Sequence, residues 1–473
     1  MKRFKKTICT VLSVLLLMVL FTGCSSQNNG GQPGNNGHPG GTPPDMPSGG
    51  GPGGTPPGGG MPPGGHSSAD VTYKATVTIS ASVSESDKTY SADTADESAL
   101  MISTSDEVTI TDPTVTKTGD SNGGDNCNFY GLNAAVLVKD GSKTTITGGS
   151  ISSSASGANG VFCYGGNGGK NGAAGDGTTV IIRDTEITTT GSGSGGIMTT
   201  GGGVTYAYDL KVITSGQSSA PIRTDRGGGT VYVDGGTYTS NGLGSPVIYS
   251  TADISVANAT LISNLSEGVC IEGKNSIALT DCELTANNTR CNGNATFLDT
   301  IMIYQSMSGD ADSGTSAFTM KGGTLTSKNG HVFHVTNTNA VISLEGVTIV
   351  NEDSANVLLS VCDDGWSGSS NIATLNASNQ QLKGAILVGS NSTLTLNLSG
   401  GTVFTGYIGG NITNAKGTVV SSSVGTVSVT LDSSSTWNLT ADSYVTSFNG
   451  DASSVRTNGY TLYVNGTALK GTN

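Results

Sequence analysis

Two carboxylates could form an acid–base pair if the chain coils regularly. Asp225 and Glu272 follow short apolar stretches that we place two coils apart, in one outward column with Ser250 between them. Two strand spacings put the carboxylates ~9.6 Å apart, near the upper end for inverting glycosidases, which leaves room for a water. Side chains nearby that could bind an acidic sugar are Arg223, Arg226, Lys274 and Tyr249. The same residues also fit a surface ion-pair ladder, which would contribute little to stability.

Acidic loops are a second candidate for chemistry, because calcium takes several oxygen ligands on a flexible turn. Asp310 and Asp312 lie in one such loop, and Asp120 and Asp125 lie in another. Neither loop completes an EF-hand or the nonapeptide calcium repeat, and solvated loops explain both equally well. Trp366 follows an acidic turn, where we expect an exposed ring suited to stacking on a sugar. The sequence therefore allows a Ca²⁺ site and a sugar contact without requiring either.

A repeat of short strands would have to position these side chains. Apolar residues alternate over segments such as 230–239 and 396–403, and each segment contains a Gly-Gly corner. A preceding apolar strand recurs at Ile222, Val247 and Val269, at intervals of roughly two dozen residues. Three short strands joined by two or three corners are what one coil of a parallel β-helix needs.

The pattern from residue 98 to residue 440 resembles the right-handed parallel β-helix superfamily. This pectin-lyase-like fold is shared by polysaccharide lyases, polygalacturonases, phage tailspikes and many cell-surface adhesins. The resemblance implies an all-β, single-stranded right-handed parallel β-helix (β-solenoid) of about twelve coils. It does not decide between catalysis and plain binding, because the fold hosts both. We expect caps at 70–97 and 441–473, since solenoid ends must avoid edge pairing. A Greek-key sandwich array is the rival fold.

The N-terminus indicates export and anchoring. Residues 1–23 have a basic start, an apolar run and a small-residue end, as in a signal peptide. The segment Phe21–Cys24 resembles the lipobox of bacterial lipoproteins, although Phe21 stands where Leu is usual, and this implies lipidation of Cys24. Residues 24–69 are mostly Gly, Pro and Asn, which predicts an extended stalk. We therefore expect an exported protein, lipid-anchored in the cell membrane and facing the cell exterior.

Histidines and cysteines give weaker indications. His331 and His334 are three residues apart in a predicted strand, so we expect them on opposite faces and not on one metal. The cysteines after the signal show no zinc spacing. Cys282 and Cys291 could form a disulfide in an oxidising compartment, or the thiols could fill the core of the solenoid.

Charge and missing motifs limit the possible functions. The net charge of −13 makes nucleic acid an unfavourable partner. The sequence contains no GxSxG, HExxH or P-loop motif. Our leading hypothesis is an adhesin or carbohydrate-binding module that meets an extracellular glycan or polysaccharide. The alternatives are a polysaccharide lyase or glycoside hydrolase acting on acidic polysaccharide through Asp225 and Glu272, and a structural protein of wall or biofilm.

Overall fold

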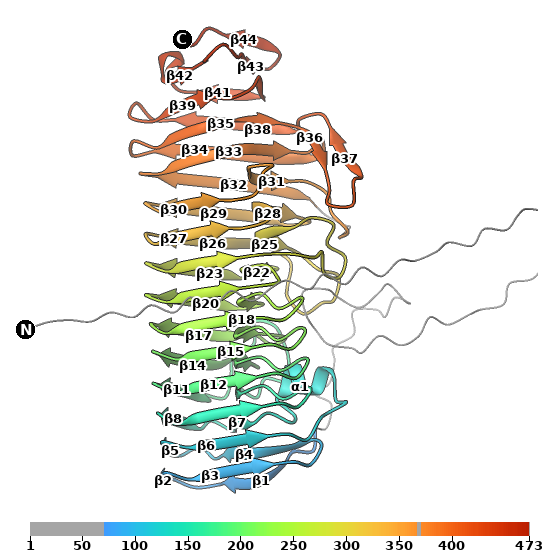
Figure 1. Ribbon diagram of the computed structural model, residues 1–473, viewed down its shortest axis with the longest axis vertical. Helices are drawn as coiled ribbons and strands as arrows, with labels where there is room; N and C mark the ends of the chain where they lie inside the picture. Colours follow the sequence, from blue (N-terminus) through green and yellow to red (C-terminus); the bar gives the residue numbers. More distant parts are fainter. Residues whose placement is uncertain (1–70, 367–369, 473) are drawn as a thin grey trace, which may run out of the picture. The chain divides into compact units, whose positions relative to one another are not determined.

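The computed structural model describes residues 71–366 and 370–472, and these fold mainly into β-strands. Three long sheets, named A, B and C, contain only parallel strand pairs (Figure 1). Over the first ten coils the chain passes from sheet A to B to C and back, so each coil adds one strand to each sheet. This is the predicted right-handed parallel β-helix, and its parallel pairing excludes the Greek-key sandwich.

Sheet A is the longest of the three, with fifteen strands. Its strands are β1 (Lys74–Ile79), β4 (Glu97–Ser103), β7 (Val136–Lys139), β10 (Val161–Tyr164), β13 (Ile197–Thr200), β16 (Ile222–Thr224), β19 (Ile248–Ser250), β22 (Val269–Glu272), β25 (Asp299–Tyr304), β28 (His331–Thr336), β31 (Val357–Val361), β33 (Gln381–Val388), β35 (Val403–Gly409), β39 (Thr436–Leu439) and β42 (Val455–Arg456).

Sheets B and C complete the coils. Sheet B contains β2 (Val83–Ser86), β5 (Glu107–Thr111), β8 (Lys143–Thr147), β11 (Thr179–Arg183), β14 (Gly203–Tyr208), β17 (Gly229–Asp234), β20 (Asp253–Ala257), β23 (Ser276–Thr280), β26 (Thr315–Lys321), β29 (Asn339–Glu345), β32 (Asn371–Ser378), β34 (Ser392–Ser399), β38 (Thr426–Leu431) and β41 (Ser447–Asn449). Sheet C contains β3 (Thr89–Ala92), β6 (Thr114–Lys117), β9 (Ser150–Ser153), β12 (Glu186–Thr189), β15 (Lys211–Thr214), β18 (Thr237–Ser240), β21 (Thr260–Ser263), β24 (Glu283–Ala286), β27 (Thr324–Ser327) and β30 (Thr348–Asn351).

The remaining elements are short. They are α1 (Asp125–Tyr130), the 3₁₀ turn η1 (Ala452–Ser454), the antiparallel pair β36 (Asn411–Thr413) and β37 (Val419–Ser422), and the small sheet of β40 (Ser443–Val445), β43 (Leu462–Val464) and β44 (Thr467–Leu469). Sheet A has more strands than the about twelve coils we predicted, because the segments 70–97 and 441–473 also supply strands that pair in it, β1 and β42.

The corners that follow most sheet B strands explain the recurring Gly, Asp and Asn. The residue that follows the strand has a positive φ in coil after coil, a conformation open to Gly and tolerated by Asp and Asn. In chain order these residues are Asp87, Asp112, Gly148, Asp184, Asp209, Gly235, Asn258, Asp281, Gly322, Gly346, Asn379 and Gly400. At the next position Gly323 has φ +70°, and a Cβ there would lie 2.1 Å from the carbonyl oxygen of Cys282.

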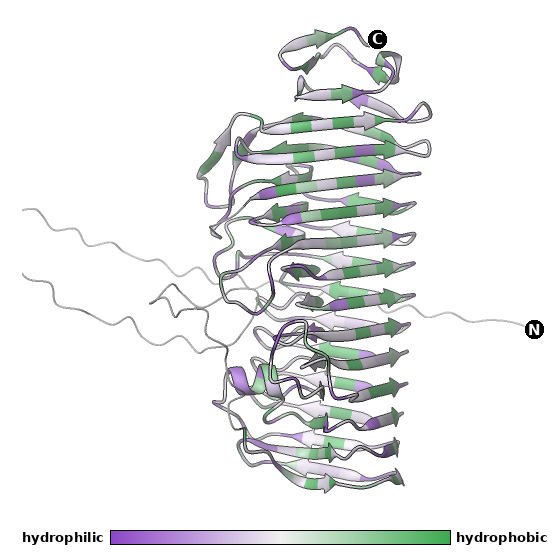
Figure 2. Ribbon diagram, turned by 180° about the vertical axis from the view of Figure 1, so that it is seen from behind, coloured by the Kyte–Doolittle hydropathy of each residue, from purple (hydrophilic) through white to green (hydrophobic). Residues whose placement is uncertain are grey.

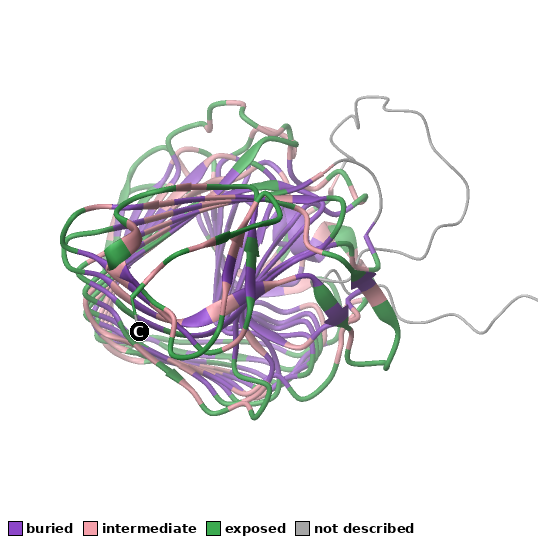
Figure 3. Ribbon diagram, turned by 90° about the horizontal axis from the view of Figure 1, so that it is seen from above, coloured by how far each residue is buried: buried purple, intermediate pink, exposed green. Residues whose placement is uncertain are grey.

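Sheets B and C each bury one face. Their strands alternate buried and exposed residues, and the apolar pattern is visible along the ribbons in Figure 2. The inward side chains of all three sheets join one hydrophobic core, and Figure 3 shows buried residues around the interior of the coils.

The middle of sheet A is buried on both faces. Strands β10, β13, β19 and β22 are buried at every residue. Three satellite clusters, separate from the main core, lie on the outer side, and they involve α1, Trp366 and β36. Figure 1 shows α1 and the β36–β37 pair on the same side of the stack. Segments that leave the coils therefore cover the face on which the predicted catalytic residues stand.

The register corrects one of our alignments. Ile222 pairs with Ile248, and Ile248 pairs with Val269, so Val247 is not the equivalent residue that we predicted. Both Val247 and Ile248 are fully buried in the core, so hydrophobicity alone could not identify the paired residue. As a consequence Ser250 pairs with Ile271, and the column of Asp225 and Glu272 passes through Thr251 instead.

Candidate functional site

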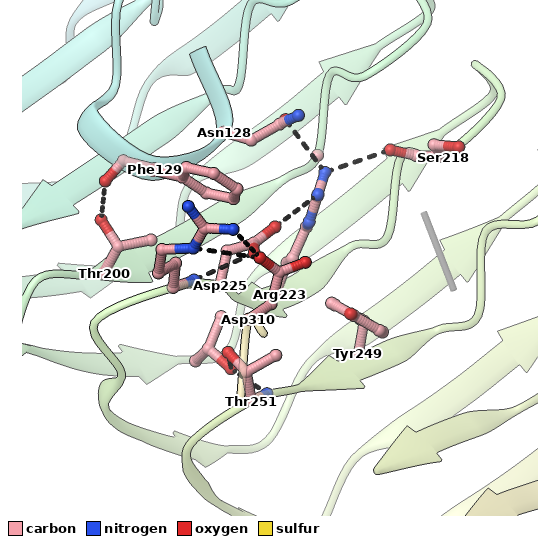
Figure 4. A network of polar contacts seen from close by, with 12 residues as sticks. Asn128, Phe129, Thr200, Ser218, Arg223, Asp225, Tyr249, Thr251 and Asp310 are labelled. Carbon is pink, nitrogen blue, oxygen red and sulfur yellow. Dashed lines mark hydrogen bonds and ion pairs between the residues drawn. The ribbon is translucent and has the colours of Figure 1, made fainter. Parts of the chain in front are cut away.

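A buried ion pair stands where we predicted a surface ladder. Asp225 follows β16 directly, and its Oδ2 lies 2.7 Å from a guanidinium nitrogen of Arg223. Arg223 also donates to the carbonyl oxygen of Ser218 and to the side chain of Asn128 on α1 (Figure 4). Asp225 is only 2% exposed, and this burial is the main reason why its pKa is raised to about 7. The charge of nearby Asp310 also raises the pKa, whereas Arg223 lowers it. Our expectation of a solvent-exposed ladder is therefore wrong.

A second ion pair, next to the first, joins two segments that are remote in sequence. Arg226 donates to Oδ1 of Asp310 through two nitrogens, at 3.1 Å and 2.5 Å. Its guanidinium also lies 4.4 Å from the ring centroid of Phe129, a cation–π contact with α1. Asp310, which we predicted as a calcium ligand, is thus bound to arginine.

The Glu272 side chain has hydroxyl partners, and among the described residues it forms no ion pair. Its carboxylate accepts hydrogen bonds from Tyr249 at 2.7 Å and from Tyr304 at 3.1 Å. Ser306 and Ser308 donate to its other oxygen. Glu272 is 1% exposed, and burial, followed by the charge of Asp310, raises its pKa. A carboxyl group with a raised pKa could act as an acid, but this one is covered by the loop that carries Ser306 and Ser308.

The two predicted catalytic carboxylates therefore belong to two closed networks. Asp225 and Glu272 share one outward column, as predicted, but neither faces solvent. Tyr249, predicted as a ligand contact, is also buried and lies between them, with its ring 5.8 Å from the guanidinium of Arg223. General acid–base hydrolysis needs a water and a substrate within hydrogen-bond reach of both groups. This arrangement instead fastens the covering loops to sheet A.

The other acidic residues predicted for calcium are Asp312, Asp120 and Asp125. Asp312 pairs with Lys274 at 2.8 Å on the surface, and Asp120 accepts from the backbone N–H of Ser156. Asp125 begins α1. Within residues 71–366 and 370–472 no group of three or more His, Cys, Asp or Glu side chains is placed to hold a metal. A Ca²⁺ site at these residues thus has no assembled ligand set in this structure.

Trp366 differs from its predicted environment. We expected an exposed ring, but the residue is 4% exposed and its ring packs 4.9 Å from that of Tyr304. The other members of this satellite cluster are Ala220, Tyr249, Cys270, Ala295 and Met302. The acidic turn before the tryptophan faces solvent only in part, because Asp364 points into the protein. Trp366 serves packing in this arrangement and cannot stack on a sugar.

A serine, two histidines and an aspartate meet on the outer face of sheet A, which sequence reasoning missed. The Nδ1 atoms of His331 and His334 lie 2.7 and 2.8 Å from the hydroxyl of Ser360, so both rings lie on one face, contrary to our prediction. Nε2 of His334 lies 3.3 Å from Oδ2 of Asp364. Burial, and then the neighbouring His334, lower the pKa of His331 to about 3.

This group has the residue types of a hydrolase triad but no access. Ser360, His334 and the Asp364 carboxylate are all fully buried, and both imidazoles pack against the ring of Phe297. A serine nucleophile must reach a substrate carbonyl from an open side. We therefore assign these residues to the packing of strands β28 and β31.

A partly exposed aromatic row lies on the outer face of sheet B, and sequence reasoning missed this as well. Tyr206 and Tyr232 are register partners whose rings stack 5.0 Å apart at an interplanar angle of 11°. Beside them the guanidinium of Arg183 lies 3.7 Å from the ring centroid of Tyr208. Aligning β14 with β17 residue by residue would have revealed this row, because both tyrosines then fall at one position.

The cysteines resolve the alternative that the sequence left open. All six cysteines of the described residues are free, including Cys282 and Cys291. Cys282 is fully buried in the main core, so its thiol fills space there.

Comparison with known proteins gives no further guide to the site. No protein-family model, curated protein or solved structure matches this chain. Among the described residues, none of the helices is long and apolar enough to cross a membrane.

Proposed function

We propose that this protein is a non-catalytic glycan-binding protein of the cell surface, an adhesin or carbohydrate-binding module built on a β-helix. The observation that carries the proposal is the contrast between two faces. The carboxylates suited to sugar hydrolysis are sealed beneath loops on sheet A, whereas the stacked tyrosines lie on the outer face of sheet B, where Tyr232 is exposed and Tyr206 is half-buried. Aromatic rings that face solvent are suited to stack against the apolar face of a sugar ring.

The proposed location rests on the sequence. The signal peptide at 1–23, the lipidation of Cys24 and the stalk at 24–69 all lie outside the described residues. A basic start, an apolar run and a lipobox-like end support export and lipid attachment. A Cys24→Ala variant should therefore appear in the medium, and membrane retention of this variant equal to that of the native chain would contradict the anchor.

The test of function is a binding screen with a product assay in the same wells. Full-length protein is applied to a polysaccharide and glycan array with and without Ca²⁺, and released reducing sugar and unsaturated uronate are measured. We expect binding without product. Product formation that is lost in Asp225→Asn would support the polysaccharide lyase or glycoside hydrolase instead. Self-association of the protein without any glycan binding would support a structural protein of wall or biofilm.

A further inference from the structure

The stacked tyrosines of sheet B end at a small residue. Along one outward column Tyr206 pairs with Tyr232, Tyr232 pairs with Ser255, and Ser255 pairs with Ala278. Tyr206 therefore covers one face of the Tyr232 ring, and the next coil supplies only a hydroxymethyl group. Tyr232 is 44% exposed, in keeping with a ring that has one open face.

The spacing between neighbouring coils fits one sugar ring above Tyr232. Adjacent strands are ~4.8 Å apart, and stacked rings prefer centroid separations of about 4.5–7 Å. The two tyrosine rings already keep a spacing of 5.0 Å. A six-membered sugar ring above Ser255, with its C–H face on Tyr232, would thus continue the stack in the position that a third aromatic side chain would take.

Two carboxylates flank the position. Asp234 is two residues after Tyr232, and Asp253 is two residues before Ser255, so both point outward on the same face. Asp234 accepts one hydrogen bond from Asn258 at 2.7 Å, and Asp253 accepts one from Ser276 at 2.6 Å. A carboxylate can accept about four hydrogen bonds, so both can also accept from sugar hydroxyls.

We propose that Tyr232 is the stacking platform for one neutral pyranose of a bound glycan, seated over Ser255 with its hydroxyl groups donating to Asp234 and Asp253. The inference rests on the proposed function and names its site and sugar class. The two carboxylates repel a uronate at this position, which selects neutral sugars. Single-stranded nucleic acid also stacks on aromatic rings, but its phosphates would meet the same repulsion.

The experiment compares four variants of the full-length protein. Tyr232→Ala removes the platform. Ser255→Tyr fills the sugar position with a third ring, at a strand position where tyrosine is favourable. Tyr232→Phe keeps the platform. Tyr444→Ala is the matched control, because Tyr444 is 45% exposed and stacks on Tyr463 with ring centroids 5.1 Å apart in the C-terminal segment.

The readout is the dissociation constant for soluble β-glucan, xylan, mannan and polygalacturonate, measured by affinity electrophoresis. We expect Tyr232→Ala and Ser255→Tyr to weaken binding to a neutral polysaccharide at least about tenfold. Tyr232→Phe and Tyr444→Ala should stay within about twofold, because both keep the platform intact. Circular dichroism confirms that each variant keeps its fold.

Three results would overturn the inference. Full binding by both Tyr232→Ala and Ser255→Tyr would place the site elsewhere and leave the proposed function standing. A Tyr232-dependent preference for polygalacturonate would refute the neutral sugar class. If the native protein binds no polysaccharide or glycan, the proposed function itself fails, and the inference fails with it.

Discussion

Replacing Asp225 with Asn should change how the stability of the protein depends on pH. The Asp225 carboxyl is buried beside Arg223, and burial raises its pKa to about 7, far above the usual value for aspartate. In the folded protein this group therefore keeps its proton until the pH approaches neutrality. In the unfolded chain it loses that proton near pH 4. Asparagine resembles the protonated carboxyl and does not titrate.

The direction and the size of the change in stability with pH follow from this difference in proton binding. Between about pH 4 and pH 7 the folded state binds more protons at Asp225 than the unfolded state, so the native protein loses stability as the pH rises. A difference of about 3 pKa units corresponds to about 4 kcal/mol, which is the upper limit of the effect. The free energy of unfolding of Asp225→Asn should thus rise relative to the native protein by up to about 4 kcal/mol from pH 4 to pH 8.

The assay is urea unfolding followed by far-ultraviolet circular dichroism at one-unit steps from pH 4 to pH 8. The comparison uses only how the difference in the free energy of unfolding between variant and native protein changes with pH. Any cost of the substitution that does not depend on pH therefore cancels. Asp312→Asn is the matched control, because Asp312 is exposed and ion-paired with Lys274, which lowers its pKa. The difference in the free energy of unfolding between Asp312→Asn and the native protein should not change with pH above pH 4. A flat or falling difference for Asp225→Asn would refute the reasoning.

Three further predictions address packing and ionisation. Gly323→Ala should lower the free energy of unfolding by well over about 2 kcal/mol, because the added Cβ would clash with the carbonyl oxygen of Cys282. Gly401→Ala should lower it by only about 1–2 kcal/mol, because Gly401 has a positive φ but open space around it, and equal urea midpoints for the two variants would contradict this. His331 should stay neutral when folded, because its pKa is lowered to about 3, so it contributes a stability loss as pH falls from 6.5 towards 3; an imidazole NMR titration with a midpoint near 6.5 would disprove it. Trp366→Ala should lower the free energy of unfolding by about 3–5 kcal/mol, and a loss below about 1 kcal/mol would indicate an exposed indole.

The fold was predictable because its rules are local. Alternating strands and positive-φ corners repeat in most coils, so short segments such as 230–239 identify the architecture. The register was not fully predictable, since Val247 and Ile248 are both core residues and only their pairing partners distinguish them. A shift of one residue at this strand replaced Ser250 by Thr251 in the predicted column.

The site was less predictable because its contacts are remote in sequence. Arg226 and Asp310 are 84 residues apart, and Arg223 and Asn128 are 95 apart. No periodicity within the coils shows that these segments fold back over sheet A, so the predicted catalytic column could not be recognised as buried. The Tyr206 and Tyr232 pair, by contrast, follows from register alone and could have been found.

Carboxyl footprinting tests the central claim most directly, namely that the acidic pair on sheet A is closed and the face of sheet B is open. The native full-length protein is labelled briefly with a carbodiimide and glycine ethyl ester at neutral pH, and modified residues are located by mass spectrometry. We predict rapid labelling of Asp234 and Asp253, which are exposed, and none of Asp225 or Glu272. Labelling of Asp225 and Glu272 at a rate comparable to Asp253 would contradict the account and restore an open acid–base pair.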